Sequence, residues 1–470
     1  MRKFLATMLA AAMTVSLVAC GGGSNGGSST AASDAPAAAS TAAEAGTAAA
    51  EVSTAAEEVS TPEATAEPVS LTFWTYPVGG WGNSDNVDAL LASFNEKYPE
   101  ITVTMEYLDY TNGDDQVNTA IEGGNAPDLI MEGPERLVAN WGARGLMVDL
   151  SDLFADPEAA DIYANVTSAC LSPDGNYYEY PLCMVAHCMA INKTIFEEAD
   201  ALQYLNLDNH TWTTEDFFKA VQAIYDSGHT NVAAIYCEGQ GGDQGTRAII
   251  NNLYSGKFTN PEHTAYAVNS PENIQALEEL YAQDGINFDP ALVGGGEQDL
   301  LRNNTLAMAF CWNAASQTKI PDGMDTYGIT DVGDEIIPMN FPTDDGKVEL
   351  CGGIWGFGIF DNGDQAKIDA AKAFIRFMAN ENVKDAVLAS GFFPAHSGVT
   401  DVYAGTETAD VMAMFTKDFM PNLGDYYQVV PGWAQARTAW WNMLQRIGSG
   451  GDVATEVEAF ETEANTAAGQ

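Results

Sequence analysis

The segment 71–131 reads LTFWTYPVGGWGNSDNVDALLASFNEKYPEITVTMEYLDYTNGDDQVNTAIEGGNAPDLIM. Three short runs rich in β-formers alternate here with two stretches whose apolar residues recur at helical spacing. A strand–helix–strand–helix–strand order predicts a mainly parallel sheet with helices on both faces. In such sheets ligands bind beyond the carboxyl ends of the strands. Tyr76, Trp81 and the stretch from Glu132 to Arg136 follow these ends, so we predict that they lie at a binding site.

Strand and helix signals continue along the rest of the chain. Thr213 or Thr214 is placed to cap a helix, because acidic residues follow in the first turn and apolar residues then recur on one face. Further strands are expected at 233–237, 305–311 and 352–360, and further helices at 370–378, 434–447 and 452–467. The sequence therefore predicts an α/β fold throughout the body.

Length and composition limit the classes of protein that this chain can be. It has 470 residues, of which 46% are hydrophobic, so most of it can bury a core. At roughly 100–200 residues per domain, the length fits two or three folding units, or one large bilobed unit. The 66 acidic and 19 basic side chains give a net charge of −47, which repels phosphate backbones. Nucleic acid is therefore excluded as a partner, although the charge by itself names no ligand.

The N-terminus carries an export signal. Arg2 and Lys3 precede an apolar run from Phe4 to Val18, which is the layout of a secretory signal peptide over residues 1–19. The small residue before Cys20 resembles the lipobox of bacterial lipoproteins, in which the cysteine is acylated, for instance with palmitate. Residues 20–69 are mostly Ala, Gly, Ser, Thr, Pro and Glu, a composition that predicts a disordered tether. We expect a body held at the outer face of the membrane by lipid alone.

The remaining cysteines do not indicate a disulfide scaffold or a metal site. Six of them follow the tether: Cys170, Cys183, Cys188, Cys237, Cys311 and Cys351. A body with a full core does not need disulfides, so we expect mostly buried free thiols. If one bridge forms, we expect Cys170 with Cys183, since the turn signal between them would join two short strands. Cys183, His187 and Cys188 lack a nearby fourth zinc ligand, so no metal is predicted.

The sequence lacks the signatures of an enzyme or of a bound cofactor. The only G-x-S-x-G motif lies in the tether, where no strand and helix can form a nucleophile elbow, and there is no Walker A motif. With 66 carboxylates, a glycosidase that uses two of them stays open as an alternative.

Tryptophans at loop positions point to a carbohydrate. Trp81, Trp141, Trp312, Trp355 and Trp433 lie at strand ends or beside turns. Aromatic faces stack on sugar rings, while carboxylate, amide and guanidinium groups take the hydrogen bonds of the hydroxyls. A cleft of carbohydrate size is therefore credible.

Eight motifs follow one another along the body: LTFW (71–74), FNEKYPEITV (94–103), GNAPDL (124–129), YPL (180–182), AINK (190–193), GGIWG (352–356), AKAFIRFM (371–378) and GFFPA (391–395). With this ordered set the body, from about residue 70 to 465, resembles the extracellular solute-binding proteins, family 1, of ABC importers, and is similar to maltose-binding proteins. It implies a type II periplasmic-binding-protein-like fold in which a multi-strand hinge joins two lobes. The lobe boundaries that it implies are 70–181 plus about 340–380 for the first lobe, and 182–339 plus about 381–470 for the second.

The resemblance also implies a function and partners. Such a protein would capture a mono- or oligosaccharide between its lobes and deliver it to ABC permease subunits, without catalysis or a cofactor. We expect a monomer.

Site residues of the first lobe follow from the stretch after Pro127-Asp128. In maltose-binding proteins an acid–arginine pair that contacts sugar falls at the positions of Glu135 and Arg136. The last position of the strand is Glu132 here instead of an aromatic residue, so this sugar contact differs from the family pattern.

Three further motifs supply the other site residues. Trp312 matches an aromatic residue that stacks on sugar in relatives, and Trp355 belongs to the Gly-Gly-x-Trp element, which implies that it faces the cleft from the first lobe. Trp433 and Arg437 would reach the cleft from the C-terminal helices.

Two alternatives to a carbohydrate binder stay open at this point. The same fold could bind a glycerophosphodiester, which would require Arg437 or Arg136 in the cleft, or a polyamine, which the many carboxylates would suit. The other alternative is a surface glycoside hydrolase.

Overall fold

The computed structural model describes residues 67–110, 112–238, 243–293 and 296–470, apart from the side chains of 236–238 and 290–293. All of these belong to one compact unit, Thr65–Gln470. The predicted signal peptide, Cys20 and nearly all of the predicted tether lie outside the described residues.

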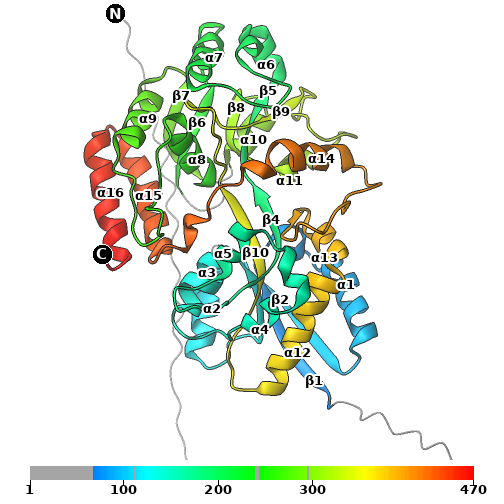
Figure 1. Cartoon of the computed structure of the whole chain (residues 1–470). Coiled ribbons are helices and arrows are strands. Elements are labelled where there is room, and N and C mark those ends of the chain that lie inside the picture. Colours follow the sequence, from blue (N-terminus) through cyan, green and yellow to red (C-terminus); the bar gives the residue numbers. More distant parts are fainter. Residues whose placement is uncertain (1–66, 111, 239–242, 294–295) are drawn as a thin grey trace, which may run out of the picture. The chain divides into compact units, whose positions relative to one another are not determined.

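The first lobe is built on a six-stranded sheet (Figure 1). Its strand order is β11-β4-β10-β3-β1-β2, with bounds Phe393–Pro394, Tyr180–Ala186, Gly352–Ile359, Leu129–Glu132, Val69–Thr75 and Ile101–Tyr107. Strand β1 pairs in parallel with both β2 and β3, which confirms the parallel strands predicted from the segment 71–131. Strand β10 is antiparallel to β3 and β4. The carboxyl ends of β1 and β3 therefore lie side by side.

Helices cover this sheet through an aromatic core. The longer ones are α1 (Ser84–Lys97), α2 (Gly113–Glu122), α12 (Gln365–Arg376) and α13 (Val383–Ser390). The shorter ones are η1 (Gly79–Gly82), α3 (Pro134–Arg136), η2 (Leu137–Gly142), α4 (Ser151–Phe154), η3 (Pro157–Asp161), α5 (Ala164–Cys170) and η5 (Phe377–Glu381). The ring of Phe374 on α12 packs edge-on against Phe73 of β1 and Phe94 of α1, at centroid distances of 5.4 and 5.1 Å.

The second lobe contains two smaller sheets. Strands β5 (Cys188–Asn192), β8 (Met308–Trp312) and β9 (Ile336–Met339) form one in the order β8-β5-β9, and β6 (Ala233–Glu238) pairs in parallel with β7 (Ile286–Val293). The surrounding helices are α6 (Lys193–Glu198), η4 (Ala201–Tyr204), α7 (Thr214–Asp226), α8 (Asp243–Leu253), α9 (Pro271–Ala282), α10 (Gly296–Arg302), α11 (Ala314–Thr318), α14 (Ala409–Asp418), η6 (Met420–Asn422), η7 (Tyr427–Val429), α15 (Trp433–Gly448) and α16 (Val453–Ala467).

Local capping explains where two of these helices begin. The Thr213 hydroxyl accepts a hydrogen bond from the Asp216 amide at 3.1 Å, so Thr213 is the N-cap of α7, one of the two positions expected. Asp452 accepts from the Thr455 amide at 3.0 Å and caps α16. Such caps satisfy backbone N–H groups that have no partner inside the helix.

The chain crosses between the lobes along β4 and β10, which lie next to each other in Figure 1. Strand β4 leads through His187 into β5, and the His187 amide donates to the Cys351 carbonyl at 2.8 Å. We expected the second lobe to resume near residue 381, but the hydrogen bonds place the next segment with the first lobe. Strand β11 pairs with β4, and the Trp81 indole donates to the Ala386 carbonyl of α13 at 3.0 Å.

The conditional disulfide between Cys170 and Cys183 is wrong, because both cysteines are free and buried. The predicted turn does form, and Leu171 bridges Tyr177 across it. This hairpin places the Tyr178 amide against the Cys170 carbonyl, at 3.4 Å. Cys183 lies further along the chain, in β4, where it pairs with Trp355 of β10. It therefore does not meet Cys170. Cys188, Cys311 and Cys351 are free thiols as well.

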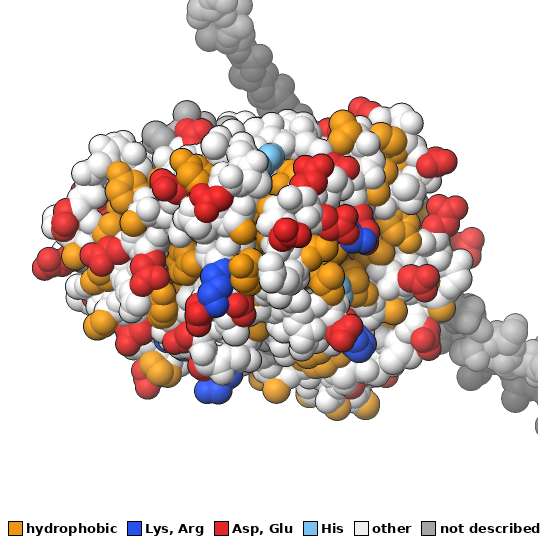
Figure 2. Space-filling view, turned by 90° about the horizontal axis from the view of Figure 1, so that it is seen from above, with side chains coloured by type: hydrophobic (Ala, Val, Ile, Leu, Met, Phe, Trp, Pro, Cys, Tyr) orange, Lys and Arg blue, Asp and Glu red, His pale blue; other side chains and the backbone are white. Residues whose placement is uncertain are grey.

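Acidic side chains are the commonest charged groups on the face of the body shown in Figure 2. Figure 2 shows Asp and Glu side chains scattered over one face, with few Lys or Arg among them. Across the described residues, no helix is both long and apolar enough to cross a bilayer. In the same residues, no group of three or more His, Cys, Asp or Glu side chains could hold a metal ion.

Candidate functional site

A buried arginine organises the end of β3. The chain turns from Glu132 into α3, and this turn brings Arg136 back over the strand end. Arg136 donates to the Glu132 carboxylate at 2.8 Å and, through Nε, to Asp114 of α2 at 2.7 Å. Only 7% of Arg136 is exposed, so these carboxylates supply the charge partners that a buried guanidinium needs.

Two tyrosines extend this cluster toward solvent. Tyr76, which follows β1, donates to the Asp114 carboxylate at 2.5 Å. The ring of Tyr110 stacks on that of Tyr76 with centroids 5.3 Å apart, and Arg136 lies 4.9 Å from the Tyr76 ring centre. Tyr76 is fully buried, whereas Tyr110 is 40% exposed. The buried ring of Tyr76 therefore supports the ring of Tyr110, which is partly accessible to solvent.

The carboxyl groups of this wall differ in charge state because their surroundings differ. Burial raises the pKa of Glu132 to about 8, although the charge of Arg136 opposes the shift. Burial also acts to raise the pKa of Asp114, but the hydrogen bonds and charge of Arg136 outweigh it and lower that pKa. On the first wall Asp114 is therefore held ionised, whereas burial and the contact with Arg136 act in opposite directions on Glu132.

The second lobe contributes a buried ion triad. Asp243, at the start of α8, is completely buried and bonds to Arg247 one turn later. Arg437 of α15 binds the same carboxylate through Nε at 2.8 Å and through a terminal nitrogen at 2.5 Å. Burial alone would raise the pKa of Asp243, but the two arginines lower it to about 2.

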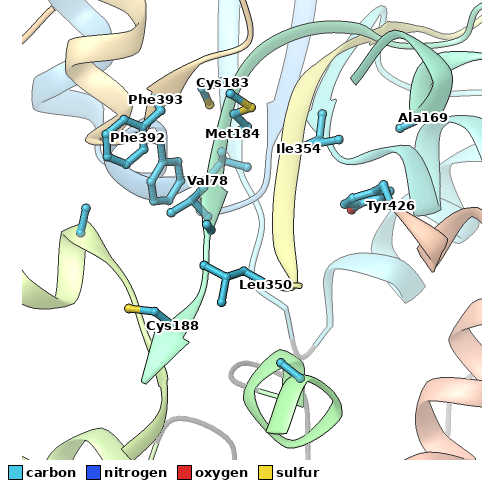
Figure 3. Close-up of a cluster of buried hydrophobic side chains, with 14 of the residues drawn as sticks. Val78, Ala169, Cys183, Met184, Cys188, Leu350, Ile354, Phe392, Phe393 and Tyr426 are labelled. Carbon is cyan, nitrogen blue, oxygen red and sulfur yellow. The ribbon is translucent and has the colours of Figure 1, made fainter. Parts of the chain in front are cut away.

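Three consecutive side chains between η6 and α15 join the two walls; we call residues 426–428 the clasp. The Tyr426 hydroxyl donates to Glu135 of the first lobe at 2.6 Å, and Tyr427 accepts from Arg247 of the second at 2.9 Å. Gln428 donates to the Gly352 carbonyl of β10 at 3.2 Å. Figure 3 shows Tyr426 near Ala169 and Ile354, among the apolar side chains around β4 and β10.

A pocket of about 210 Å³ lies between these walls. Its polar and aromatic lining is Asp114, Glu135, Arg136, Asn140 and Arg144 from the first lobe, with Trp433, Gln435 and Arg437 from α15. It is smaller than the roughly 300–1,000 Å³ of common ligand sites, so it fits a small ligand as it stands and a larger one only when the lobes separate. A hollow of about 910 Å³ lies elsewhere, beside α7 and α9. Another, of about 890 Å³, lies between residues 248–261 of the second lobe and the segments 345–351 and 421–427, so it reaches Tyr427 of the clasp and Asn165 of the first lobe.

A family model described as bacterial extracellular solute-binding protein matches residues 80–385, more than half of the chain. The chain belongs to that family. No curated protein sequence matches it.

Solved structures with the same fold support the assignment. An ABC substrate-binding protein from Listeria monocytogenes in complex with cycloalternan is 17% identical, with a TM-score of 0.66 over 86% of this chain and 100% of that one. A solute-binding protein from Thermotoga lettingae bound to α-D-tagatose is 19% identical, with a TM-score of 0.65 over 85% and 99%. Maltose-bound MalE3 from T. maritima is 14% identical, with a TM-score of 0.64 over 85% and 99%. The predicted two-lobed type II periplasmic-binding-protein fold is confirmed.

The structure of this solute-binding protein brings most of the predicted site residues together. The members of the sequence-based set that lie in the two walls are Tyr76, Glu132, Glu135, Arg136, Trp433 and Arg437. Trp433 starts α15, lines the pocket and lies 4.9 Å from the Arg247 guanidinium.

The other three predicted residues lie outside the pocket lining. Trp81 is fully buried in the core of the first lobe and contacts Phe73 at 6.2 Å between ring centroids. Trp312 is fully buried in the second lobe, where its indole donates to Gln317 at 2.8 Å. Trp355 stacks on Phe392 at 4.9 Å, beside β4. Their roles in binding stay predictions: Trp81 and Trp312 make the contacts of core residues, and Trp355 is half-buried.

Sequence reasoning missed Asp114, Tyr110, Asp243, Arg247 and the clasp. Asp243 lies within the glycine-rich stretch 239–245 and opens a helix, where a carboxylate is favoured. The pair Tyr426–Tyr427 stands shortly before Pro431-Gly432 and the tryptophan-rich α15. These positions are visible in the sequence, but their partners lie far away along it.

We expect Asp243→Asn to lower the free energy of unfolding by about 3–5 kcal/mol at pH 7, because it leaves the Arg247 charge buried without a carboxylate. The folded pKa of Asp243, about 2, lies below its ordinary value of 3.8. The stability that this group supplies is therefore present above about pH 4 and is lost as the pH falls toward 2. Urea unfolding across this range should show that the difference in unfolding free energy between wild type and variant becomes smaller as the pH falls.

Asp152→Asn is the matched control, since Asp152 pairs with Lys372 while half exposed. Loss of such a surface pair should cost less than about 1 kcal/mol. The assigned role of the triad would be contradicted if the two variants lost the same free energy of unfolding. It would also be contradicted if the loss in Asp243→Asn did not become smaller in acid.

Proposed function

We propose that this protein captures a carbohydrate in the pocket between its lobes and delivers it to the membrane permease of an ABC importer. The observation that carries the proposal is the lining of that pocket. Carboxylates of the first lobe and guanidinium groups and amides of both lobes converge there with the indole of Trp433. Tyr110, which is 40% exposed, lies with its ring centre 5.9 Å from the guanidinium of Arg136. Relatives of the same fold were solved with cycloalternan, α-D-tagatose and maltose, which agrees with this class of ligand.

The chemistry of a sugar suits such a lining. Each hydroxyl both donates and accepts a hydrogen bond, so a polyhydroxylated ring needs acceptors and donors on several sides. Glu135 and Asp114 supply acceptors, and Arg437 supplies donors from the opposite wall. Stacking on an aromatic face contributes roughly 0.5–1.5 kcal/mol per ring.

Transport would follow from a shift between open and closed lobes. A ligand that touches both walls binds the closed form more tightly and so increases its population. The clasp links Glu135 to Arg247 through adjacent residues, so closure and pocket formation depend on the same contacts. The closed form would then present both lobes to the permease, and the carbohydrate would leave chemically unchanged.

The anchor belongs to the same proposal. Lipidated Cys20 would hold the protein at the outer face of the membrane, as a monomer, and some fifty residues of Gly/Ser-like chain would give a reach of roughly 40 Å. The body could then meet both free sugar and the permease.

Tyr110→Ala should weaken carbohydrate binding tenfold or more, about 1.4 kcal/mol, because it removes the exposed stacking face. The midpoint of thermal unfolding should move by only a few degrees, since the ring is 40% exposed. The measurement is a thermal-shift screen of the full chain against mono- and oligosaccharides, followed by calorimetry with the best ligand.

Tyr281→Ala is the control for this variant. Tyr281 is 42% exposed on α9 and packs on Phe288, away from the pocket, so its loss should leave affinity unchanged. Unchanged affinity in Tyr110→Ala would remove Tyr110 from the site, and absence of binding by any carbohydrate would overturn the proposed function.

Cys20→Ser should release the protein from the membrane fraction into the medium, because the acylated thiol is the proposed anchor. Fractionation followed by immunoblotting measures this. Cys351→Ser is the control, because its half-buried thiol contacts the Tyr427 hydroxyl at 3.0 Å and a serine keeps that hydrogen bond. Retention of Cys20→Ser on the membrane would refute lipid anchoring.

A further inference from the structure

Helix α15 begins at the pocket with backbone donors that have no acceptor. Its N-cap is Gly432, which has no side chain to cap the helix, and Gly432 and the next three residues all line the pocket. Among the described residues, nothing accepts a hydrogen bond from the amides of Trp433, Ala434 or Gln435, and the first turn contains no acidic side chain. The start of α15 therefore presents N–H groups and the positive end of the helix dipole to the pocket.

The indole of Trp433 is a further donor without a partner. Trp433 lines the pocket and is only 5% exposed, and its Nε1 has no hydrogen-bond acceptor among the described residues. Trp440, two turns later on the same helix, donates its indole N–H to the Thr246 hydroxyl at 2.9 Å. Buried N–H groups are normally paired, so the indole of Trp433 is suited to a ligand that supplies an acceptor.

Two guanidinium groups add positive charge to this part of the pocket lining. Arg437, one turn into α15, shares the carboxylate of Asp243 with Arg247, so this triad has one more positive group than negative. Arg144 lines the pocket from the first lobe. Among the described residues it forms no ion pair, and its side chain donates only to Asn140, at 3.4 Å.

The two carboxylates in the pocket lining are already bound within the first lobe and the clasp. Asp114 accepts from the Tyr76 hydroxyl and from Nε of Arg136, at 2.5 and 2.7 Å. Glu135 accepts from the Tyr426 hydroxyl at 2.6 Å. The part of the lining that α15 supplies, residues 432–435 and 437, contains no carboxylate at all. Donors and positive charge are therefore in excess on that side.

We propose that the start of α15 and the two arginines form a subsite for an anionic group, so that the captured carbohydrate is an acidic one, either a uronic acid or a phosphorylated sugar. We call the amides of 433–435, the indole N–H of Trp433, and the guanidinium groups of Arg144 and Arg437 the anion subsite. This inference rests on the proposed carbohydrate function and narrows its ligand class.

The physical argument is that an anion supplies what these donors lack. The oxygens of a carboxylate or phosphate accept several hydrogen bonds at once, and the N-terminus of a helix favours negative charge. Charge-assisted hydrogen bonds are roughly twice as strong as neutral ones. A hydroxyl in the same place would bring no charge and would leave more of the donors unpaired, so a neutral sugar gains less.

The test is calorimetry on the full chain with matched pairs of sugars. Glucuronate is compared with glucose, galacturonate with galactose, and glucose 6-phosphate with glucose. We expect at least one acidic sugar to bind tenfold or more tightly than its neutral counterpart at low salt. This preference should shrink at about 1 M salt, because ions screen the attraction between charges.

Ala434→Glu tests the role of the helix start. Ala434 is exposed, lines the pocket and occupies the second position of α15, so a carboxylate there repels a bound anion. The variant should lose most of the preference for the acidic sugar and stay folded, since an acid suits the first turn of a helix. Ala454→Glu is the matched control, because it makes the same change at the exposed second position of α16, outside the pocket lining. That variant should keep the preference.

Arg144→Gln tests the contribution of the first lobe. It should reduce the preference for the acidic sugar about tenfold, because it removes a pocket guanidinium that has no carboxylate partner among the described residues. Arg446→Gln is its control. Arg446 lies in the last turn of α15, pairs with Glu456 and is not part of the pocket lining, so its loss should leave the preference unchanged.

Each result decides between defined possibilities. Neutral sugars that bind as tightly as acidic ones would overturn the anion subsite and leave the proposed function standing, as would a preference that survives both Ala434→Glu and Arg144→Gln. A preference for glucose 6-phosphate over both uronates would support the subsite and identify the anion as a phosphate. Binding of glycerophosphocholine that is lost in Ala434→Glu, without binding of any sugar, would support the subsite and overturn the carbohydrate. Inorganic phosphate that binds as tightly as the acidic sugars would overturn the inference about the ligand.

Discussion

The buried carboxylate of Asp243 is the interaction on which the cleft depends. It has no exposed surface, so its charge must be balanced inside the protein, and Arg247 and Arg437 do this from two different helices. That requirement fixes α15 against α8. Since α15 begins at Trp433, the same ion triad also sets where the indole reaches the pocket. Arg247 also donates a hydrogen bond to Tyr427 and so fixes the clasp against the ion triad.

The two walls are opposite in charge balance. On the first wall Asp114, Glu132 and Glu135 lie with the guanidinium groups of Arg136 and Arg144, whereas on the second two arginines share the carboxylate of Asp243. Bringing the walls together therefore gains attraction across the pocket, and the charge of Arg437 indeed acts to lower the pKa of Asp114 on the far side. The pocket between them is polar on every side, which favours a ligand rich in hydroxyl and charged groups over an apolar one.

The fold could be predicted because its signals are local. Apolar spacing and β-rich runs located β1, α1, β2, α2 and β3 within a few residues, and the rule about strand ends led to Tyr76, Glu132, Glu135 and Arg136. The tryptophan argument was weaker, since an indole beside a turn can point inward as easily as outward, and Trp81 and Trp312 are fully buried. The Asp243–Arg247 pair lies at helical spacing, but the second partner of Asp243, Arg437, is 194 residues away in sequence, and Tyr426 is 291 residues from Glu135. No spacing rule reaches that far.

The comparison of two buried acids shows why Glu179 differs from an ordinary core residue. Glu297 is as deeply buried, but one of its oxygens accepts the Phe310 amide at 3.1 Å, so its surroundings partly satisfy it. Glu179 has no such bond, and its nearest charged neighbours are acids of the same wall. Desolvating a polar group without a partner costs about 1–3 kcal/mol. An apolar side chain at this position would pack without that cost, so Glu179 lowers the stability of the first lobe relative to such a residue.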